Sequence, residues 1–236
     1  MELFYVSPNN VHETELILDD FERKHVVNTL RKTAGDALTV TDGQGTLFWG
    51  EIVQTSPQVR VRILRKEIKE TPPNIALACG FIKQNRMDFI LEKGTELGVQ
   101  TFHFFRSHYA NYFSANTTRL QKVVRQALKQ SLHYFFPKIF LHPNLEAFFD
   151  HQPSSQTLKL IAIDSTYPTL RNLFEQNRWQ ASTGVMISVG PEGGFTREEI
   201  ERFKSNGYLG FSLGKHRLRA ETAAIASIAG IQQWIN

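Results

Sequence analysis

The sequence has very little cysteine and no long hydrophobic run, and each absence excludes a class of protein. Cys79 is the only cysteine among 236 residues, so an internal disulfide and a multi-cysteine metal site are both excluded. It lies in the apolar run IALACGF, which is typical of a small buried residue rather than a nucleophile. No stretch approaches the roughly 20 consecutive apolar residues that a membrane helix needs.

The sequence also lacks a recognisable targeting segment. Its first residues, MELFYVSPNN, contain no basic stretch followed by an apolar one, as a secretory signal or transit peptide would. Hydrophobic residues make up 41% of the chain and charged residues 21%, which excludes a disordered chain and favours a globular one. We therefore expect a cytoplasmic protein with no membrane segment, and we assign no metal ligands.

Common phosphate-binding patterns are missing as well. The chain has no G-x-x-x-x-G-K-[ST], and its glycine-rich stretch VGPEGGFTREE, residues 189–199, does not fit G-x-G-x-x-G. Thr196 and Glu199 have the spacing of a capping box, so a helix is predicted to start there and to end near Gly207. The loop before it is either a tight strand-to-helix turn or a place where a ligand approaches the backbone closely. Glu192 argues against a phosphate ligand, because its carboxylate would repel one.

A second stretch, LGKHRLRAETA at residues 213–223, has a similar anatomy. A short apolar run ends at Gly214, four basic residues follow within five positions, and a helix is predicted from about Ala220 to Ile235. His216 in this loop is either a surface residue or a catalyst. The small residues of the helix indicate close packing, either in the core or against another subunit.

Charge divides the chain near Pro72 and Pro73, which remove two backbone donors and predict a linker. Residues 1–70 carry 9 basic and 11 acidic side chains, a net charge of −2, whereas residues 71–236 carry 18 and 12, a net charge of +6. The basic second part suits a polyanionic partner such as RNA, although solubility alone would also explain it.

Patterns of the two parts differ. Residues 1–70 predict a small, mostly β unit, with strands at LFYV, ALTVTDG, TLFWGEI and QVRVRIL. A hairpin turn is predicted at residues 42–45, and one helix at residues 19–32, capped by Asp19 or Asp20.

From Asn74 onward, apolar runs alternate with helical patterns, which predicts an α/β domain with a mainly parallel sheet. Its predicted strands are IALACGF, TFHFF, KIFLH, LKLIAID, GVMISVG and FSLG, with helices through DFILEKGTELG and over residues 117–135, and a surface loop at residues 152–157. Ligands of such sheets bind beyond the carboxyl ends of the strands, where the loop after GVMISVG lies.

One predicted strand has a basic face. Arg60 and Arg62 alternate with Val59, Val61 and Ile63, which has the period of a strand with one buried side. The basic side is either a solvated surface or a nucleic-acid surface.

GPEGGF, followed about twenty residues later by LG-x-x-x-LR-x-ETA, resembles the RsmE family of 16S ribosomal RNA uridine N3-methyltransferases, of the knotted SPOUT class that uses S-adenosylmethionine. HVVNTLR with Gly35-Asp36, and EKGTELGV at residues 92–99, also resemble family segments, so the matches span nearly the whole chain. The resemblance implies a PUA-like β-barrel over residues 1–70 that helps bind RNA, and a SPOUT methyltransferase domain with a deep trefoil knot over residues 71–236. It also implies a homodimer acting on 16S rRNA, within the small ribosomal subunit.

The resemblance further implies which residues form the site. Cofactor neighbours would be Val189, Gly190, Glu192, Gly193, Gly194, Leu213, Gly214, Leu218 and Thr222, with Asp164 and Ser165 as a further wall. Arg219 would stabilise negative charge on the uracil, and Glu221 or Glu192 would accept the N3 proton. Candidates for RNA phosphates are Arg60, Arg62, Lys83, Arg86, Arg106, Arg125 and Arg217.

Two other interpretations stay open at this point. One is a different SPOUT methyltransferase acting on another rRNA or tRNA site, and the other is a noncatalytic RNA-binding ribosome assembly factor.

Overall fold

A computed structural model describes the chain except for residues 1, 114, 152–156, 177–183 and 236. The loop predicted at residues 152–157 therefore lies, apart from Thr157, outside the described residues. The chain divides into two compact units. The first comprises Met1–Pro72 and Arg125–Phe136, and the second comprises Pro73–Val124 and Pro137–Asn236.

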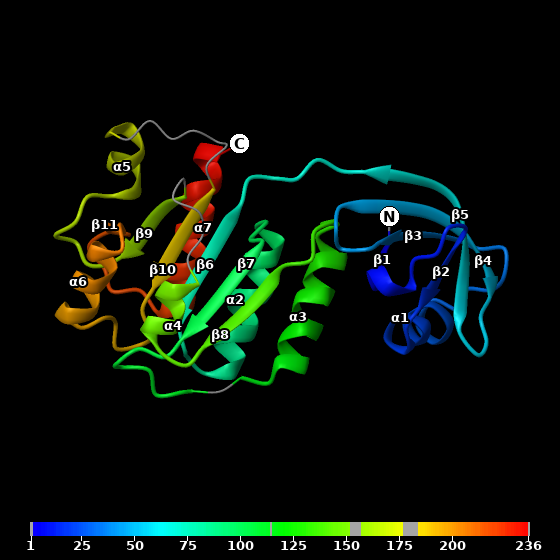
Figure 1. The fold of residues 1–236 in the computed structure, drawn as a ribbon, viewed down its shortest axis with the longest axis horizontal. Coiled ribbons are helices and arrows are strands. Elements are labelled where there is room, and N and C mark those ends of the chain that lie inside the picture. The colour runs from blue at the N-terminus through cyan, green and yellow to red at the C-terminus, as the bar shows by residue number, and fades with distance from the viewer. Residues whose placement is uncertain (1, 114, 152–156, 177–183, 236) are drawn as a thin grey trace. The chain divides into compact units, whose positions relative to one another are not determined.

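The first unit contains a five-stranded sheet (Figure 1). Its strands, in spatial order, are β1 (Leu3–Tyr5), β3 (Ala37–Thr41), β4 (Thr46–Gln54), β5 (Val59–Ile68) and β2 (Glu15–Leu18). The β1 and β3 strands run parallel, and the other neighbours run antiparallel. Four of these strands and the hairpin between β3 and β4 confirm the sequence pattern. The prediction missed β2, whose four residues are too few to show alternation and which forms by pairing with β5.

Helical segments cover part of this sheet. The 3₁₀ helix η1 (Pro8–Asn10) precedes β2, and α1 (Asp20–Lys24) continues as the π-helix η2 (His25–Thr29). The Asp19 carboxylate accepts a hydrogen bond from the Glu22 N–H, which confirms Asp19 as the N-cap. Phe4, Leu16 and Val26 are among the buried core residues that join these helices to the sheet.

The segment Arg125–Phe136 also belongs to the first unit. Leu128 packs with Leu3 and Leu47 in a buried apolar cluster, and the Gly45 N–H donates to the Tyr134 carbonyl at 2.9 Å. The Phe136 N–H donates to the Gly43 carbonyl, so the predicted hairpin turn receives this distant part of the chain.

A six-stranded sheet forms the second unit, and all its strands are parallel. In spatial order the strands are β11 (Leu209–Phe211), β9 (Leu158–Ala162), β10 (Val185–Val189), β6 (Ile75–Gly80), β7 (Thr101–Phe105) and β8 (Lys138–His142). The predicted α/β domain with a parallel sheet is confirmed. The last strand lies at Leu209–Phe211 rather than at FSLG, because only those residues reach β9.

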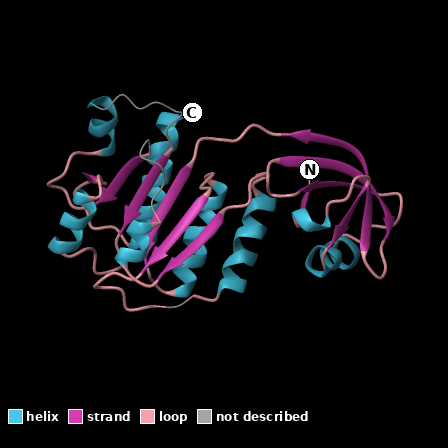
Figure 2. Ribbon diagram, in the orientation of Figure 1, coloured by secondary structure: helices cyan, strands magenta, loops and turns pink. Residues whose placement is uncertain are grey.

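Helices lie on both faces of this sheet (Figure 2). They are α2 (Gln84–Glu96), α3 (Thr117–Gln130, whose second half belongs to the first unit), α4 (Leu145–Asp150), α5 (Leu170–Gln176), α6 (Arg197–Ser205) and α7 (Ala220–Ile235). The predicted start and end of α6 are confirmed, as is α7. The α3 helix was predicted to continue to Phe135, which is wrong: it ends at Gln130, and Leu132 has a φ of 57°. The prediction did not include α4 and α5, which are only 6 and 7 residues long.

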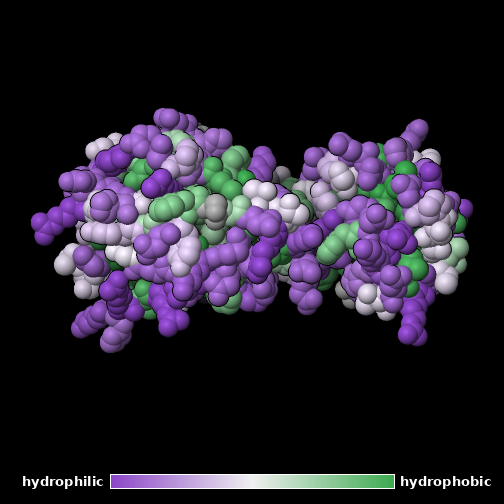
Figure 3. Space-filling model, turned by 90° about the horizontal axis from the view of Figure 1, so that it is seen from below, coloured by the Kyte–Doolittle hydropathy of each residue, from purple (hydrophilic) through white to green (hydrophobic). Residues whose placement is uncertain are grey.

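Apolar side chains join the helices to the sheet. Phe148 of α4 and Phe203 of α6 pack with Met186 on one face, while α7 contacts β6, β10, α2 and α5. Among the described residues, no helix is long and apolar enough to cross a membrane. The face drawn in Figure 3 carries mostly hydrophilic side chains with hydrophobic ones interspersed.

Candidate functional site

Loops from three neighbouring strands meet at one edge of the parallel sheet. Because every strand runs the same way, the carboxyl ends of β9, β10 and β11 all lie at this edge. Asp164 follows β9, the GPEGG loop at residues 190–194 follows β10, and the basic loop at residues 213–219 follows β11. The two motifs singled out in the sequence are thus neighbours in space.

A cavity of about 570 Å³ opens between these loops. Its lining is formed by Ala162, Ile163, Asp164, Ser165, Val189, Gly190, Pro191, Glu192, Gly193, Gly194, Phe195, Ile200, Leu213, Gly214, Lys215, His216, Arg217, Leu218, Ala220 and Ala223. Most of these residues are glycine or apolar, so backbone groups supply much of the polar surface. The volume lies within the range of roughly 300–1,000 Å³ that is common for small-molecule sites.

Local sequence holds the loops in this arrangement. Thr196 and Glu199 form the predicted capping box at the start of α6, with bonds of 3.1 and 2.9 Å. Gly194 and Gly214 have φ angles of +75° and +118°, which other residues rarely adopt, and a side chain at either position would meet nothing within 4 Å. The Arg217 guanidinium donates to the Glu192 carbonyl at 3.0 Å and so joins the two motifs.

An ionised carboxylate forms part of the wall. Hydrogen bonds from the Thr166 hydroxyl and backbone N–H, at 2.6 and 2.9 Å, lower the pKa of Asp164. A cavity with backbone hydrogen-bonding groups and apolar side chains, with the acids Asp164 and Glu192 on its wall together with the cations Lys215 and Arg217, suits a small ligand that carries both polar and apolar groups.

Two partly buried carboxylates share one arginine beside the cavity. Arg86 lies 3.1 Å from Glu192 (Nη1 to Oε1) and 3.6 Å from Glu221 (Nε to Oε1). The second oxygen of each carboxylate is buried and has no hydrogen-bond partner among the described residues. Burial and these two carboxylates raise the pKa of the Cys79 thiol, which is fully buried and stays protonated. One arginine side chain thus pairs with a carboxylate from each of the two motifs.

The structure brings most predicted cofactor neighbours together, with one difference. Eight of the nine line the cavity, but Thr222 is exposed and does not, because Ala220 and Ala223 present their side of α7 instead. Arg219 is exposed, and it forms no ion pair with any residue that the structure describes. Its charge is therefore available to a partner.

The residues predicted to hold RNA phosphates fall into two groups. Arg60 pairs with Glu15 at 2.7 Å and Arg62 with Glu51 at 3.0 Å, so acidic neighbours compensate these two guanidinium charges. Arg125 and Arg86 also pair with acids, and only 12% and 25% of their side chains are exposed. Arg62 is exposed but paired, whereas Lys83, Arg106 and Arg217 are exposed and lie in loops at the carboxyl edge of the parallel sheet.

Sequence reasoning gave no role to residues 107–113, which follow β7 at the same edge. The stretch RSHYANYF at residues 106–113 is rich in aromatic side chains and follows a predicted strand of the parallel sheet. An aromatic-rich loop directly after a strand of a parallel sheet is a feature from which a binding loop could have been predicted. For metals, no group of three or more potential ligands occurs in the described part of the chain.

The parallel sheet with a backbone-lined cavity at its carboxyl edge defines an α/β protein that binds a small ligand at that edge. The chain belongs to the RNA methyltransferase domain family, whose model matches residues 69–232.

Known relatives match over nearly the whole chain. A ribosomal RNA small subunit methyltransferase E from Rickettsia conorii is 28% identical over 97% of this chain and 93% of its own length. One from Buchnera aphidicola is 26% identical over 91% of this chain and 86% of its own length. A crystal structure of a ribosomal RNA small subunit methyltransferase E from Neisseria gonorrhoeae, bound to S-adenosyl methionine, has a TM-score of 0.84 and 28% identity and covers 99% of this chain. That match takes in 98% of the Neisseria chain.

Proposed function

We propose that this chain is an S-adenosylmethionine-dependent methyltransferase that modifies N3 of a uridine in 16S rRNA of the small ribosomal subunit. The observation that carries the proposal is the meeting of the GPEGG loop and the LR-x-ETA loop in one cavity, beside two carboxylates with unpartnered oxygens. The family match and the relatives named small subunit methyltransferase E support the rRNA substrate.

The cavity fits S-adenosylmethionine. Open space beside the backbone of Gly194 and Gly214 allows the adenine and ribose edges to approach main-chain groups, and Leu213 and Leu218 offer apolar surface. Asp164 and the unpartnered Glu192 oxygen supply negative charge that attracts the sulfonium. The cofactor, when bound, supplies an electrophilic methyl group.

The protein must also manage a proton, because N3 of neutral uracil carries one. Arg219 stabilises negative charge on a uracil carbonyl, and Glu221 or Glu192 accepts the proton directly or through water. Arg86 keeps both carboxylates in place without neutralising both of them. N3 takes part in base pairing, so the target is unpaired when it reacts.

The proposal also assigns roles to the two units and to the exposed cations. The first unit acts as a PUA-like RNA-binding β-barrel, the second contains the SPOUT knot, and the chain works as a cytoplasmic homodimer. Lys83, Arg106 and Arg217 hold RNA phosphates, because they are exposed cations in the loops at the edge of the sheet where the cavity lies.

The decisive experiment is mass spectrometry of 16S rRNA from a strain that lacks the gene for this chain. The 3-methyluridine should be absent, and the wild-type gene should restore it. A 3-methyluridine that persists in the deletion strain refutes the proposal, and loss of a methyl group from another rRNA or tRNA site would instead identify a different substrate.

A thermal melt with S-adenosylmethionine separates the enzyme from a noncatalytic assembly factor. Ligand at about 100 times its dissociation constant adds roughly 2.7 kcal/mol to the stability, which for a chain of this size raises the midpoint by about 5 to 10 °C. An unchanged midpoint would favour the assembly factor. S-adenosylmethionine added to heat-denatured and refolded protein serves as the control for reversibility.

A further inference from the structure

The loop after β7 places a set of exposed aromatic and basic side chains beside the cavity. Between Arg106 and Phe113, the Ser107 and Ala110 side chains are buried. His108, Tyr109 and Phe113 are exposed, Tyr109 by 46% and Phe113 by 54%. We call the side chains of Arg106, His108, Tyr109 and Phe113 the aromatic ledge.

The aromatic ledge is firmly attached to the loop that carries the cofactor motif. The His108 N–H donates to Glu199 Oε1 at 2.7 Å, while the other oxygen of this buried carboxylate accepts from the Thr196 N–H. One glutamate therefore ties the β7 loop to the start of α6, immediately after GPEGG.

Tyr109 lies directly against the GPEGG loop. A Cβ atom built at Gly193 would lie 2.5 Å from the Tyr109 Cβ, so the tyrosine packs on the bare backbone of a residue that lines the cavity. The ring of His108 meets Tyr109 edge to face, with centroids 4.7 Å apart. Half of the Tyr109 side chain still faces solvent next to the cavity.

The composition of the ledge favours unpaired RNA as its occupant. The Arg106 guanidinium lies 4.0 Å from the centre of the Phe113 ring. A cation and an aromatic face therefore lie side by side on the ledge. Single-stranded nucleic acids are held by aromatic rings that stack on bases and by cations that contact the phosphates. The order of strands puts the β11, β9 and β10 loops around the cavity, and puts the β7 loop on the other side of β10, beyond β6. The ledge therefore lies on the side of the GPEGG loop that faces away from the β9 and β11 loops.

We propose that the aromatic ledge binds an unpaired nucleotide of the RNA, with Tyr109 as the residue that stacks on the base. This inference rests on the proposed RNA methyltransferase function and assigns its substrate-binding surface. Gly193 sets the position of the Tyr109 ring relative to the cavity, and Arg106 contacts a neighbouring phosphate.

The test measures RNA affinity directly, without turnover. Two probes are compared in the presence of S-adenosylhomocysteine: a labelled oligouridine of about ten nucleotides and an abasic ribose-phosphate chain of the same length. Wild-type protein should prefer oligouridine. Because base–aromatic stacking contributes roughly 5- to 150-fold in affinity, Tyr109→Ala should remove at least about 5-fold of that preference.

Three further variants sharpen the result. Tyr109→Phe should keep the preference because it keeps the ring, whereas Tyr109→Leu, which still packs on Gly193, should lose it. Phe89→Ala removes an aromatic side chain of nearly equal exposure, 44%, from helix α2 and should change nothing. S-adenosylmethionine affinity by calorimetry should be the same in all of these proteins.

Several outcomes would overturn the inference. Tyr109→Ala or Tyr109→Leu with the wild-type preference excludes stacking, as does a wild-type protein that binds both probes equally. A change of oligomeric state in Tyr109→Ala with unchanged RNA binding would assign the ledge to a second copy of the chain. These results do not depend on the 3-methyluridine measurement, so failure here is distinct from failure of the proposed function.

Discussion

At the scale of single residues, the arrangement around Arg86 decides which groups are available for chemistry. The sequence suggested that Arg86 contacts RNA, but its guanidinium lies between Glu192 and Glu221, one from each motif. The side chains are 25%, 28% and 14% exposed, so the charges interact more strongly than they would at the surface.

Replacing Arg86 with Met should lower both stability and activity. Two partly buried carboxylates would lose their shared cation, at a cost of roughly 2 kcal/mol, which corresponds to a fall of about 4 to 8 °C in the unfolding midpoint. Arg171→Met is the matched control, because Arg171 pairs with Glu175 on α5 at 79% exposure and should shift the midpoint by less than about 2 °C. Adding Glu192→Gln and Glu221→Gln to Arg86→Met should restore much of the stability; no recovery would mean that charge is not the cause.

Arg219 provides the second residue-scale prediction. Arg219→Ala should abolish methylation and leave the melting midpoint and S-adenosylmethionine affinity unchanged, because the side chain is exposed and forms no ion pair within the described residues. Methyl transfer to 16S rRNA is measured with a labelled cofactor, and Arg197→Ala, an exposed arginine at the start of α6, is the control. Near-normal turnover in Arg219→Ala would exclude its assigned role.

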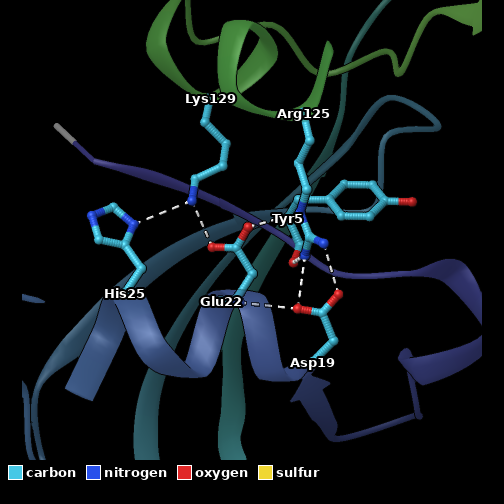
Figure 4. Close-up of polar contacts among 6 residues, drawn as sticks. All are labelled: Tyr5, Asp19, Glu22, His25, Arg125 and Lys129. Carbon is cyan, nitrogen blue, oxygen red and sulfur yellow. Dashed lines mark hydrogen bonds and ion pairs between the residues drawn. The ribbon is translucent and has the colours of Figure 1, made fainter. Parts of the chain in front are cut away.

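At the scale of elements, a buried ion cluster fastens the second half of α3 to the first unit (Figure 4). Glu22 is fully buried and accepts from Arg125 at 3.0 Å and from Lys129 at 2.7 Å. Arg125 also pairs with Asp19 at 2.7 Å. Burial alone would raise the pKa of Asp19, but hydrogen bonds from Arg125 and the Glu22 N–H outweigh it and lower this pKa. Arg125 and Lys129 therefore hold this half of the helix in the first unit. The sequence had suggested an RNA contact for Arg125.

Replacing Glu22 with Gln should loosen the segment Arg125–Phe136. Two nearly buried cations would lose one of their two counter-charges, and breaking a buried pair costs about 3 to 5 kcal/mol. Hydrogen exchange of the amides in this segment should speed up by about two to four orders of magnitude. Asp20→Asn is the control, since Asp20 is 86% exposed in its pair with Arg23, and it should leave exchange unchanged. Slow exchange in Glu22→Gln would show that apolar packing alone holds the segment.

At the scale of the whole molecule, the response of stability to pH depends on a buried histidine pair. His103 on β7 and His142 on β8 are 2.9 Å apart, ring nitrogen to ring nitrogen, and stack near His151. Burial, with added repulsion from His142 and His151, lowers the pKa of His103 to about 3, and burial also lowers that of His142.

The protein should lose stability as pH falls below about 6.5. An unfolded histidine has a pKa of about 6.5, and folded His103 has a pKa of about 3. At a pH between these two values the unfolded chain binds more protons than the folded one, so acid favours unfolding. The loss from His103 alone should reach about 2 to 3 kcal/mol at pH 4.5. Denaturant melts of His103→Gln should show a smaller difference between pH 7.5 and 4.5 than wild type, whereas the exposed His216→Gln should show the same difference. Equal pH dependence in wild type and His103→Gln would exclude the pair as its source.

The sequence by itself determined the local features of this protein. Capping at Thr196 and the glycine at the end of α6 depend on bonds between residues a few positions apart, so the pattern alone was sufficient there, whereas it left the first N-cap open between Asp19 and Asp20. Apolar runs of strand length, alternating with helical patterns, likewise predicted the parallel sheet. The two motifs located eight cavity-lining residues, because the carboxyl ends of parallel strands share one edge.

Only the tertiary structure decided which side chains meet. Strand β2 forms because β5 pairs with it, and α3 ends early because residues 134–136 bond to the β3–β4 hairpin. The partners of Arg86 and Arg125 come from positions about 100 residues away in the chain. No local pattern encodes such a distance, since a charged side chain has the same sequence signature whether it faces solvent or a buried carboxylate. The backbone motifs were thus sufficient to locate the cavity, and the partners of its charged side chains followed only from the fold.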